Sequence, residues 1–204
     1  MDGTSRRYPD EREAARRDRV AAAMAAHGRR GFLRRHEARR ADVDQPLPIG
    51  HGQTSSQPST VARMLRALEV PVGARVLDVG AGSGWTTALL AHLVGPDGVV
   101  VGVELEPDLV AWGGANLAAT GQPWARVVAA RPGVLGLPDE GPWDRVLVSA
   151  EARELPAALV GQLADGGIMV IPVAGELLTV ARRGPAPSDV TVRSEGPHRF
   201  VPLR

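Results

Sequence analysis

The chain has 204 residues, which is long enough for one domain with a full core. Its formal net charge is only +1, which argues against a protein dominated by nucleic-acid binding. Cys is absent, so disulfides, thiolate metal sites and a Cys nucleophile are excluded. All 24 Lys+Arg residues are Arg, which excludes a Lys base and a Walker A phosphate loop. The 5 His residues share no metal-ligand spacing, so we expect no metal. No long uncharged apolar run or leader-like start occurs, and we expect a cytoplasmic protein with no membrane partner.

Arginine is concentrated at the N-terminal end, where residues 1–44 hold 12 Arg against 8 acidic residues. We therefore divide the chain into an Arg-rich arm with a short helix, residues 1–44, and a main domain, residues 45–204. The first 17 residues are polar and of mixed charge, which predicts a frayed or disordered arm.

A short helix is expected next, because Val20 and Met24 recur at i, i+4 in an Ala-rich stretch that Gly28 can end. Three Arg pairs follow this helix, at 29–30, 34–35 and 39–40. Aromatic residues are nearly absent among them, so we interpret the pairs as solvated surface rather than as a nucleic-acid patch.

Residues 45–58 are rich in Gly, Pro and small polar residues, which predicts a loop, and a helix is expected to begin near Ser59. Beyond it, apolar runs that favour strands, at 75–79, 99–103, 125–129, 144–149 and 168–173, alternate with segments that favour helices, at 86–94, 107–119 and 155–164. This alternation predicts an α/β fold with a parallel sheet covered on both faces. The runs 177–182, 190–193 and 199–203 have little helix between them and predict antiparallel strands at one edge.

A glycine-rich turn follows the first of these strands, with glycines at 80, 82 and 84 and a helix directly after it. Such a turn lets a ligand lie against bare main chain beside free helix N–H groups. Glu104 ends the next strand, where an acid can accept hydrogen bonds from both ribose hydroxyls of an adenosine. Asp78 suits a cationic sulfonium cofactor better than a pyrophosphate, although an NAD-type Rossmann turn is the alternative interpretation.

The turn resembles that of class I S-adenosylmethionine-dependent methyltransferases. Residues 46–58, which include Gly52-Gln53-Thr54-Ser55-Ser56, look like the hallmark segment of protein-L-isoaspartate O-methyltransferases, whose usual core is Gly-Gln-Thr-Ile-Ser. Ser55 stands where that family has Ile. Further matches follow in order at 142–150, 162–173 and 200–203, so the resemblance covers roughly residues 18–203.

The resemblance implies a Rossmann-like class I methyltransferase fold with a seven-stranded, mostly parallel sheet and an antiparallel C-terminal edge. It implies transfer of a methyl group from S-adenosylmethionine to the α-carboxylate of isoaspartyl residues in damaged proteins or peptides, and the resulting ester then collapses to a succinimide. Separately from the resemblance, we expect a monomer. Ser56 matches the family's active-site Ser, and the alternative is a Ser that caps the next helix. The implied cofactor-binding residues are Thr54, Ser55, Ser56, Asp78, Gly80, Gly82, Gly84, Glu104, Leu105, Pro132 and Gly133.

One departure from the family pattern concerns the adenine site, because Pro132 stands where the family usually has an Asp. The loss of that contact predicts a weaker cofactor complex. Two alternatives therefore stay open: a specialised family member that methylates an Asp carboxylate of a biosynthetic peptide, and a cofactor-binding homologue without repair activity.

Overall fold

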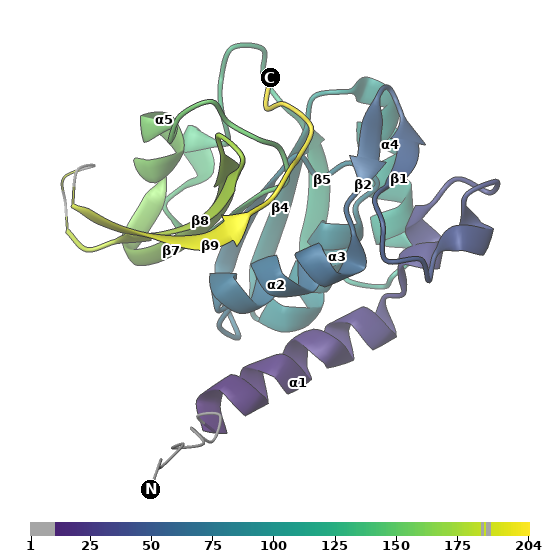
Figure 1. The fold of residues 1–204 in the computed structure, drawn as a ribbon, viewed down its shortest axis with the longest axis horizontal. Coiled ribbons are helices and arrows are strands. Elements are labelled where there is room, and N and C mark those ends of the chain that lie inside the picture. Colours follow the sequence, from purple (N-terminus) through teal and green to yellow (C-terminus); the bar gives the residue numbers. More distant parts are fainter. Residues whose placement is uncertain (1–10, 185, 187–188) are drawn as a thin grey trace, which may run out of the picture.

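The computed structural model describes residues 11–184, 186 and 189–204, with side chains from residue 19 on (Figure 1). A seven-stranded sheet in the order β5-β4-β3-β6-β7-β8-β9 forms its centre. The β7–β8 and β8–β9 pairs are antiparallel, and the other neighbouring strands are parallel. The strands of this sheet are β3 (Arg75–Val79), β4 (Val99–Glu104), β5 (Ala125–Ala129), β6 (Trp143–Val148), β7 (Leu163–Val173), β8 (Glu176–Arg182) and β9 (Val190–Pro197). The predicted α/β fold with its antiparallel C-terminal edge is therefore confirmed.

The remaining elements are helices and one small hairpin. The α-helices are α1 (Glu11–Ala26), α2 (Pro58–Leu68), α3 (Trp85–Val94), α4 (Pro107–Ala118) and α5 (Ala157–Val160). Short 3-10 helices are η1 (Arg29–Phe32), η2 (Ala38–Arg40) and η3 (Pro138–Glu140), and the hairpin pairs β1 (Leu47–Gly50) with β2 (Gln53–Ser55). None of the helices in the described part of the chain is long and apolar enough to cross a membrane.

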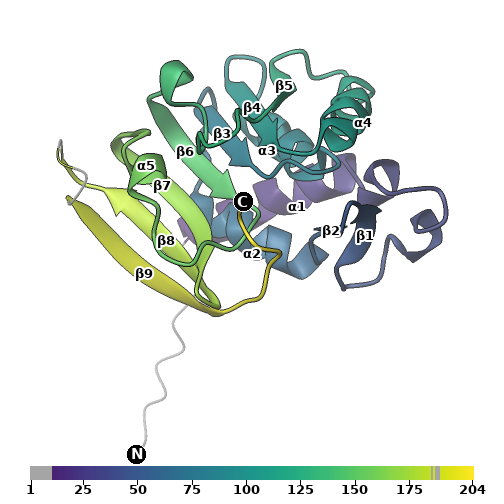
Figure 2. The ribbon, with the colours of Figure 1, turned by 90° about the horizontal axis from the view of Figure 1, so that it is seen from above.

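The core lies on both faces of the sheet because neighbouring strand residues point in opposite directions. Val76 packs with residues of α1, α2 and α3, whereas the next residue, Leu77, packs on the other face with residues of α5. Figure 2 shows β3, β4 and β6 at the centre of the molecule, with the β1–β2 hairpin beside one side of the sheet. The central strands β3, β4 and β6 are thus largely buried on both faces, which explains their almost continuous apolar sequences, whereas the edge strand β5 is only partly buried.

Helix α1 begins at Glu11, so the prediction of a disordered arm is wrong for residues 11–17, and residues 1–10 lie outside the described part. Val20 and Ala23 belong to the main core cluster because α1 packs against α2 and α3, and Phe32 of η1 belongs to the same cluster. Part of the segment before residue 45 is therefore integrated into the core of the main domain. A boundary between residues 44 and 45 stays a prediction.

Three other expectations change. Residues 47–55 form a hairpin rather than a loop, because Leu47 and Ile49 alternate inward although Pro and Gly surround them. The helix expected at 155–164 is limited to Ala157–Val160, since β7 already begins at Leu163, ahead of the strand expected at 168–173, and pairs with β6 in an irregular register. Segment 199–203 is not a strand of the sheet and makes one isolated bridge, Glu151 to Pro202.

Candidate active site

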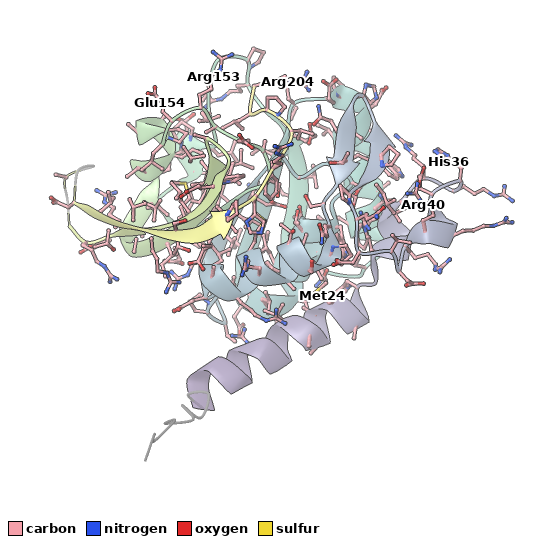
Figure 3. The ribbon with its side chains drawn as sticks, in the orientation of Figure 1. Met24, His36, Arg40, Arg153, Glu154 and Arg204 are labelled. Carbon is pink, nitrogen blue, oxygen red and sulfur yellow. The ribbon has the colours of Figure 1, made fainter. Side chains whose placement is uncertain are left out.

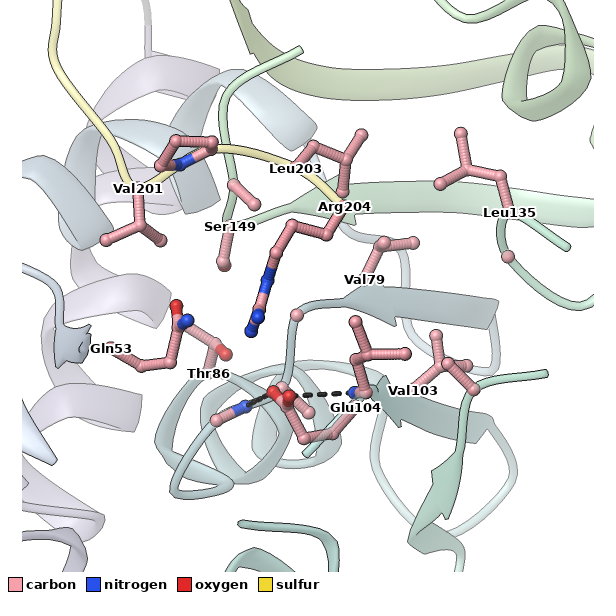
Figure 4. Close-up of a pocket in the computed structure, with 18 of the residues that line it drawn as sticks. Gln53, Val79, Thr86, Val103, Glu104, Leu135, Ser149, Val201, Leu203 and Arg204 are labelled. Atoms are coloured by element: carbon pink, nitrogen blue, oxygen red, sulfur yellow. Dashed lines mark hydrogen bonds between the residues drawn. The ribbon is translucent and has the colours of Figure 1, made fainter. Parts of the chain in front are cut away.

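A cavity of about 500 Å³ opens where β3, β4, β5 and β6 end, at the carboxyl edge of the parallel strands (Figure 4). This edge is where open α/β sheets bind their ligands. The β1–β2 hairpin and residues 201–204 add further walls. The lining comprises residue 49, residues 53–56, 79–83, 85–86, 103–105, 130–136, 149–150 and 201–204.

The glycine turn presents backbone to this cavity. Gly80 and Gly82 line it with φ of +81° and +54°, a region that residues with a side chain rarely adopt. Gly84 has a φ of +83° but is not in the lining. A Cβ at Gly84 would lie 2.6 Å from the Gly113 carbonyl oxygen, so this glycine allows α3 to approach α4. Gly84, predicted to bind the cofactor, is thus placed as a helix-packing residue.

Glu104 joins the cavity to the glycine turn. Its carboxylate accepts three backbone N–H hydrogen bonds, from Gly82 at 2.8 Å, Leu105 at 2.7 Å and Glu106 at 3.0 Å. The side chain is buried yet reaches the cavity, as Figure 4 shows. Each carboxylate oxygen can accept more than one hydrogen bond, so Glu104 can hold the turn and still accept from a ligand's hydroxyls.

Asp78 does not line the cavity. It is fully buried, and its Oδ2 accepts hydrogen bonds from the hydroxyls of Thr86 and Thr87, both at 2.7 Å, at the start of α3. Burial, supplemented by the charge of Glu104, raises the pKa of Asp78 to about 6 although the two hydroxyls act in the opposite direction. Asp78 therefore has no surface in the cavity for the expected direct contact with a sulfonium ligand. It instead binds the first residues of α3.

The loop after β5 contributes Pro132 and Gly133 to the wall of the cavity. Leu105, directly after β4, also lines the cavity. All three residues were predicted to bind the cofactor, and all three line the cavity. Arg131 also lines the cavity, and its Nη2 lies 2.7 Å from the Asp139 carboxylate. No acidic side chain of this loop lines the cavity, which follows from Pro132 standing at the position of the usual Asp.

The hairpin wall is formed by Gln53, Thr54, Ser55 and Ser56. Within the described residues, the Ser56 hydroxyl has no hydrogen-bond partner. Helix α2 is capped from elsewhere, because Asp44 Oδ1 accepts the Ser59 backbone N–H at 2.8 Å. These contacts disfavour the helix-capping interpretation of Ser56 and leave its hydroxyl available to a ligand.

Sequence reasoning missed Arg29, which was interpreted as solvated surface with its pair partner. Arg29 is only 4% exposed and donates to Ser55 from behind the hairpin wall. Other Arg side chains of this segment do face solvent, and Figure 3 shows His36 and Arg40 pointing outward. A buried and an exposed Arg look alike in the sequence, so no local signal distinguishes them.

Ser149 and the C-terminal residues were also missed as site residues. The Ser149 hydroxyl is buried beside Gly80 without a hydrogen-bond partner among the described residues, and Ser149 lines the cavity. Its place directly after a buried strand was the available signal. Figure 4 shows the Arg204 side chain directed into the cavity, and its Nη2 lies 2.6 Å from Glu106 Oε1.

Comparison with known proteins identifies this architecture. Residues 9–204 match the family model described as protein-L-isoaspartate(D-aspartate) O-methyltransferase. The chain belongs to this family. It is 44% identical over 188 residues to the protein-L-isoaspartate O-methyltransferase of Aeropyrum pernix, covering 91% of this chain and 72% of that protein. It is 43% identical over 192 residues to that of Methanopyrus kandleri, covering 92% of this chain and 84% of the relative.

Solved structures show the same relationship. A family member from Plasmodium falciparum, described as a putative protein-L-isoaspartate O-methyltransferase in complex with S-adenosyl-L-homocysteine, superimposes with a TM-score of 0.80. The two sequences are 26% identical, and the match covers 92% of this chain and 90% of the other.

Among residues 11–184, 186 and 189–204, no group of three His, Cys, Asp or Glu residues could hold a metal ion.

Proposed function

We propose that this protein transfers the methyl group of S-adenosylmethionine to the α-carboxylate of L-isoaspartyl residues in proteins or peptides. The observation that carries the proposal is the Ser56 hydroxyl. It lines the same cavity as Glu104 and the glycine turn, and it has no hydrogen-bond partner within the described residues. A chain of this family thus presents a hydroxyl donor that is available to a ligand beside the glycine turn and Glu104.

The cavity fits the cofactor. Its volume is in the range of sites for ligands of this size. Gly80 and Gly82 offer bare backbone to the amino-acid end, Glu104 offers carboxylate oxygens to ribose hydroxyls, and Leu105, Pro132 and Gly133 form an adenine wall. When bound, the cofactor supplies its methyl carbon to an oxygen of the acceptor carboxylate, and the sulfur keeps the electron pair of the broken bond.

The protein's own side chains then have to orient the acceptor and exclude water. A carboxylate is ionised at neutral pH, so the reaction needs no strong base, and no Cys or Lys is present to act as one. Ser56 can donate one hydrogen bond to the acceptor carboxylate and fix its angle. Val201 and Leu203 add apolar surface from the C-terminal segment, which limits access of water. Thr54 and Ser55 complete the hairpin wall.

Three further parts of the proposal concern the surroundings of the protein. We propose that it acts as a monomer, in the cytoplasm, and without a nucleic-acid or membrane partner. The formal net charge of +1 supports the absence of a nucleic-acid partner, because phosphate-dominated binding requires a clear excess of basic charge.

The deciding experiment offers the protein two peptides of the same sequence, one with L-isoaspartate and one with ordinary Asp, together with radiolabelled S-adenosylmethionine. Base-labile methyl ester is expected on the isoaspartyl peptide only. Equal labelling of both peptides would point to a different carboxylate substrate. Cofactor binding by calorimetry without labelling of either peptide would contradict a methyltransferase acting on such carboxylates.

A further inference from the structure

Arg29 is a buried cation directly behind the hairpin wall of the cavity. It sits in η1, which follows α1, and only 4% of the residue is exposed. Its neighbour Arg30 has a side chain that is 59% exposed and pairs with Asp42 on the surface. Two consecutive arginines thus have opposite environments, so the burial of Arg29 is a property of its position.

The guanidinium of Arg29 holds one residue with two hydrogen bonds. Nε donates to Ser55 Oγ at 3.0 Å, and Nη2 donates to the Ser55 carbonyl oxygen at 2.7 Å. Nη1 donates to the Val43 carbonyl oxygen at 3.2 Å, which ties the hairpin to the segment before it. This rigid planar fork fixes both the main chain and the side chain of the residue directly before Ser56.

The guanidinium is also close to the cavity itself. Its carbon lies 5.7 Å from the centre of the Trp85 ring, and Trp85 lines the cavity. Within the described residues, Arg29 has no carboxylate at ion-pair distance, and its acceptors are a hydroxyl and two carbonyl groups. Burial lowers the pKa of Arg29, and the charge of Asp44 counters part of that effect. Burying a cation among neutral acceptors is costly for folding, so simple stability does not explain it.

We infer that Arg29 is a positioning residue for the methyl transfer. Its fork fixes Ser55 so that the next hydroxyl, that of Ser56, faces the acceptor, while its charge favours an anionic acceptor on the other side of the wall. The inference rests on the proposed function. It adds to that function a residue in η1 that is remote in sequence from the hairpin it controls.

The test compares Arg29→Met and Arg29→Lys with the matched control Arg30→Met. Single-turnover rates and KM are measured with the isoaspartyl peptide well below each melting temperature, and S-adenosylhomocysteine affinity is measured by calorimetry. Arg29→Met is expected to lower kcat at least about tenfold while the cofactor Kd stays within about twofold, since Arg29 does not itself line the cavity and the glycine turn and Glu104 are unchanged. Arg29→Lys keeps the charge without the fork and is expected to remain well below the wild-type rate. Arg30→Met should leave both kcat and the cofactor Kd unchanged.

A second readout does not depend on activity. Amide hydrogen exchange in residues 53–57 of the ligand-free protein should be faster in the Arg29 variants than in Arg30→Met, because the fork no longer orders the hairpin. If Arg29→Met does not fold, Arg29→Lys carries both measurements. Wild-type kcat in the folded Arg29 variants, a parallel loss of cofactor affinity, or unchanged exchange would each overturn the inference. An inactive wild-type protein would instead refute the proposed function, and the exchange rates would still test the positioning of the hairpin.

Discussion

Glu104 Oε2 accepts the backbone N–H of Gly82 at 2.8 Å, so the acid at the end of β4 holds the glycine turn that follows β3. One carboxylate thereby fixes the position of the bare backbone and lines the same cavity. Any change at Glu104 is therefore expected to act on the cofactor in two ways, by removing oxygens that can accept from ribose hydroxyls and by loosening the turn.

Glu104→Ala should weaken S-adenosylmethionine binding by about 1.5–3 kcal/mol, the range for hydrogen bonds to a charged group. Calorimetry on the folded variant measures the change. The matched control is Glu154→Ala, because Glu154 is exposed and does not line the cavity (Figure 3). Equal affinities of the two variants would mean that Glu104 does not contact the cofactor.

Ser56→Ala should reduce turnover of the isoaspartyl peptide by roughly ten- to a thousandfold with a nearly unchanged cofactor Kd, because one positioned hydrogen bond to the acceptor is lost. Single-turnover rates and thermal melts on the same preparation give the two quantities. Ser59→Ala is the control, since Ser59 is exposed at the start of α2 outside the cavity. If Ser56→Ala lowers only the melting temperature, the acceptor is held by other groups.

Pro132→Asp should tighten the cofactor complex by about 0.5–1.5 kcal/mol, the worth of one hydrogen bond, if Pro132 has replaced an adenine-binding acid. Pro132 already lies in the exposed lining of the cavity, so the new carboxylate has room. Titration calorimetry of the wild type and the variant decides the sign. Weaker binding by a folded variant would show that the 130–134 loop is shaped around the proline.

The buried carboxyl of Asp78 should make stability depend on pH. Its folded-state pKa of about 6 lies above the usual 3.8, so the folded protein binds more protons than the unfolded chain between these values. The free energy of unfolding therefore falls as pH rises through this window, by about 3 kcal/mol in total from this group, and the loss remains at higher pH.

Asp78→Asn removes that contribution. The free energy of unfolding of the variant minus that of the wild type should therefore increase as pH rises from about 4 to about 6. This prediction holds whether the variant is more or less stable than the wild type at about pH 4. Urea unfolding of both proteins across this range measures the difference, in which the titration of other groups largely cancels. A difference that stays constant with pH would contradict the raised pKa.

Arg204→Met should speed dissociation of S-adenosylhomocysteine by about 1.4- to fivefold, because the partly exposed Arg204–Glu106 pair joins a wall of the cavity to the residue before α4 and such pairs contribute about 0.2–1 kcal/mol. Stopped-flow fluorescence can follow release, since Trp85 lines the cavity. The control is Arg153→Met, an exposed Arg outside the lining (Figure 3). Equal release rates for the two variants would mean that the Arg204–Glu106 pair does not help to retain the ligand.

The sequence alone determined the sheet of this protein and the centre of its candidate site. The strands 75–79 and 125–129 begin and end where their apolar runs predicted, because a short apolar run bounded by turn residues is a local signature of a strand in a parallel sheet. The glycine turn and Glu104 meet at one edge because successive parallel strands place their carboxyl ends together. These features depend on residues close in sequence and on the topology that the alternation of elements imposes.

Only the tertiary structure decided which way individual side chains face. Asp78 turns toward α3 rather than the cavity, and of two adjacent serines it is Ser55 that binds Arg29 while the hydroxyl of Ser56 stays available. Arg29 is buried and Arg30 exposed, although the sequence presents them as an equivalent pair. Burial and orientation at these positions depend on which distant segments pack against them, and that packing leaves no periodic pattern in the local sequence.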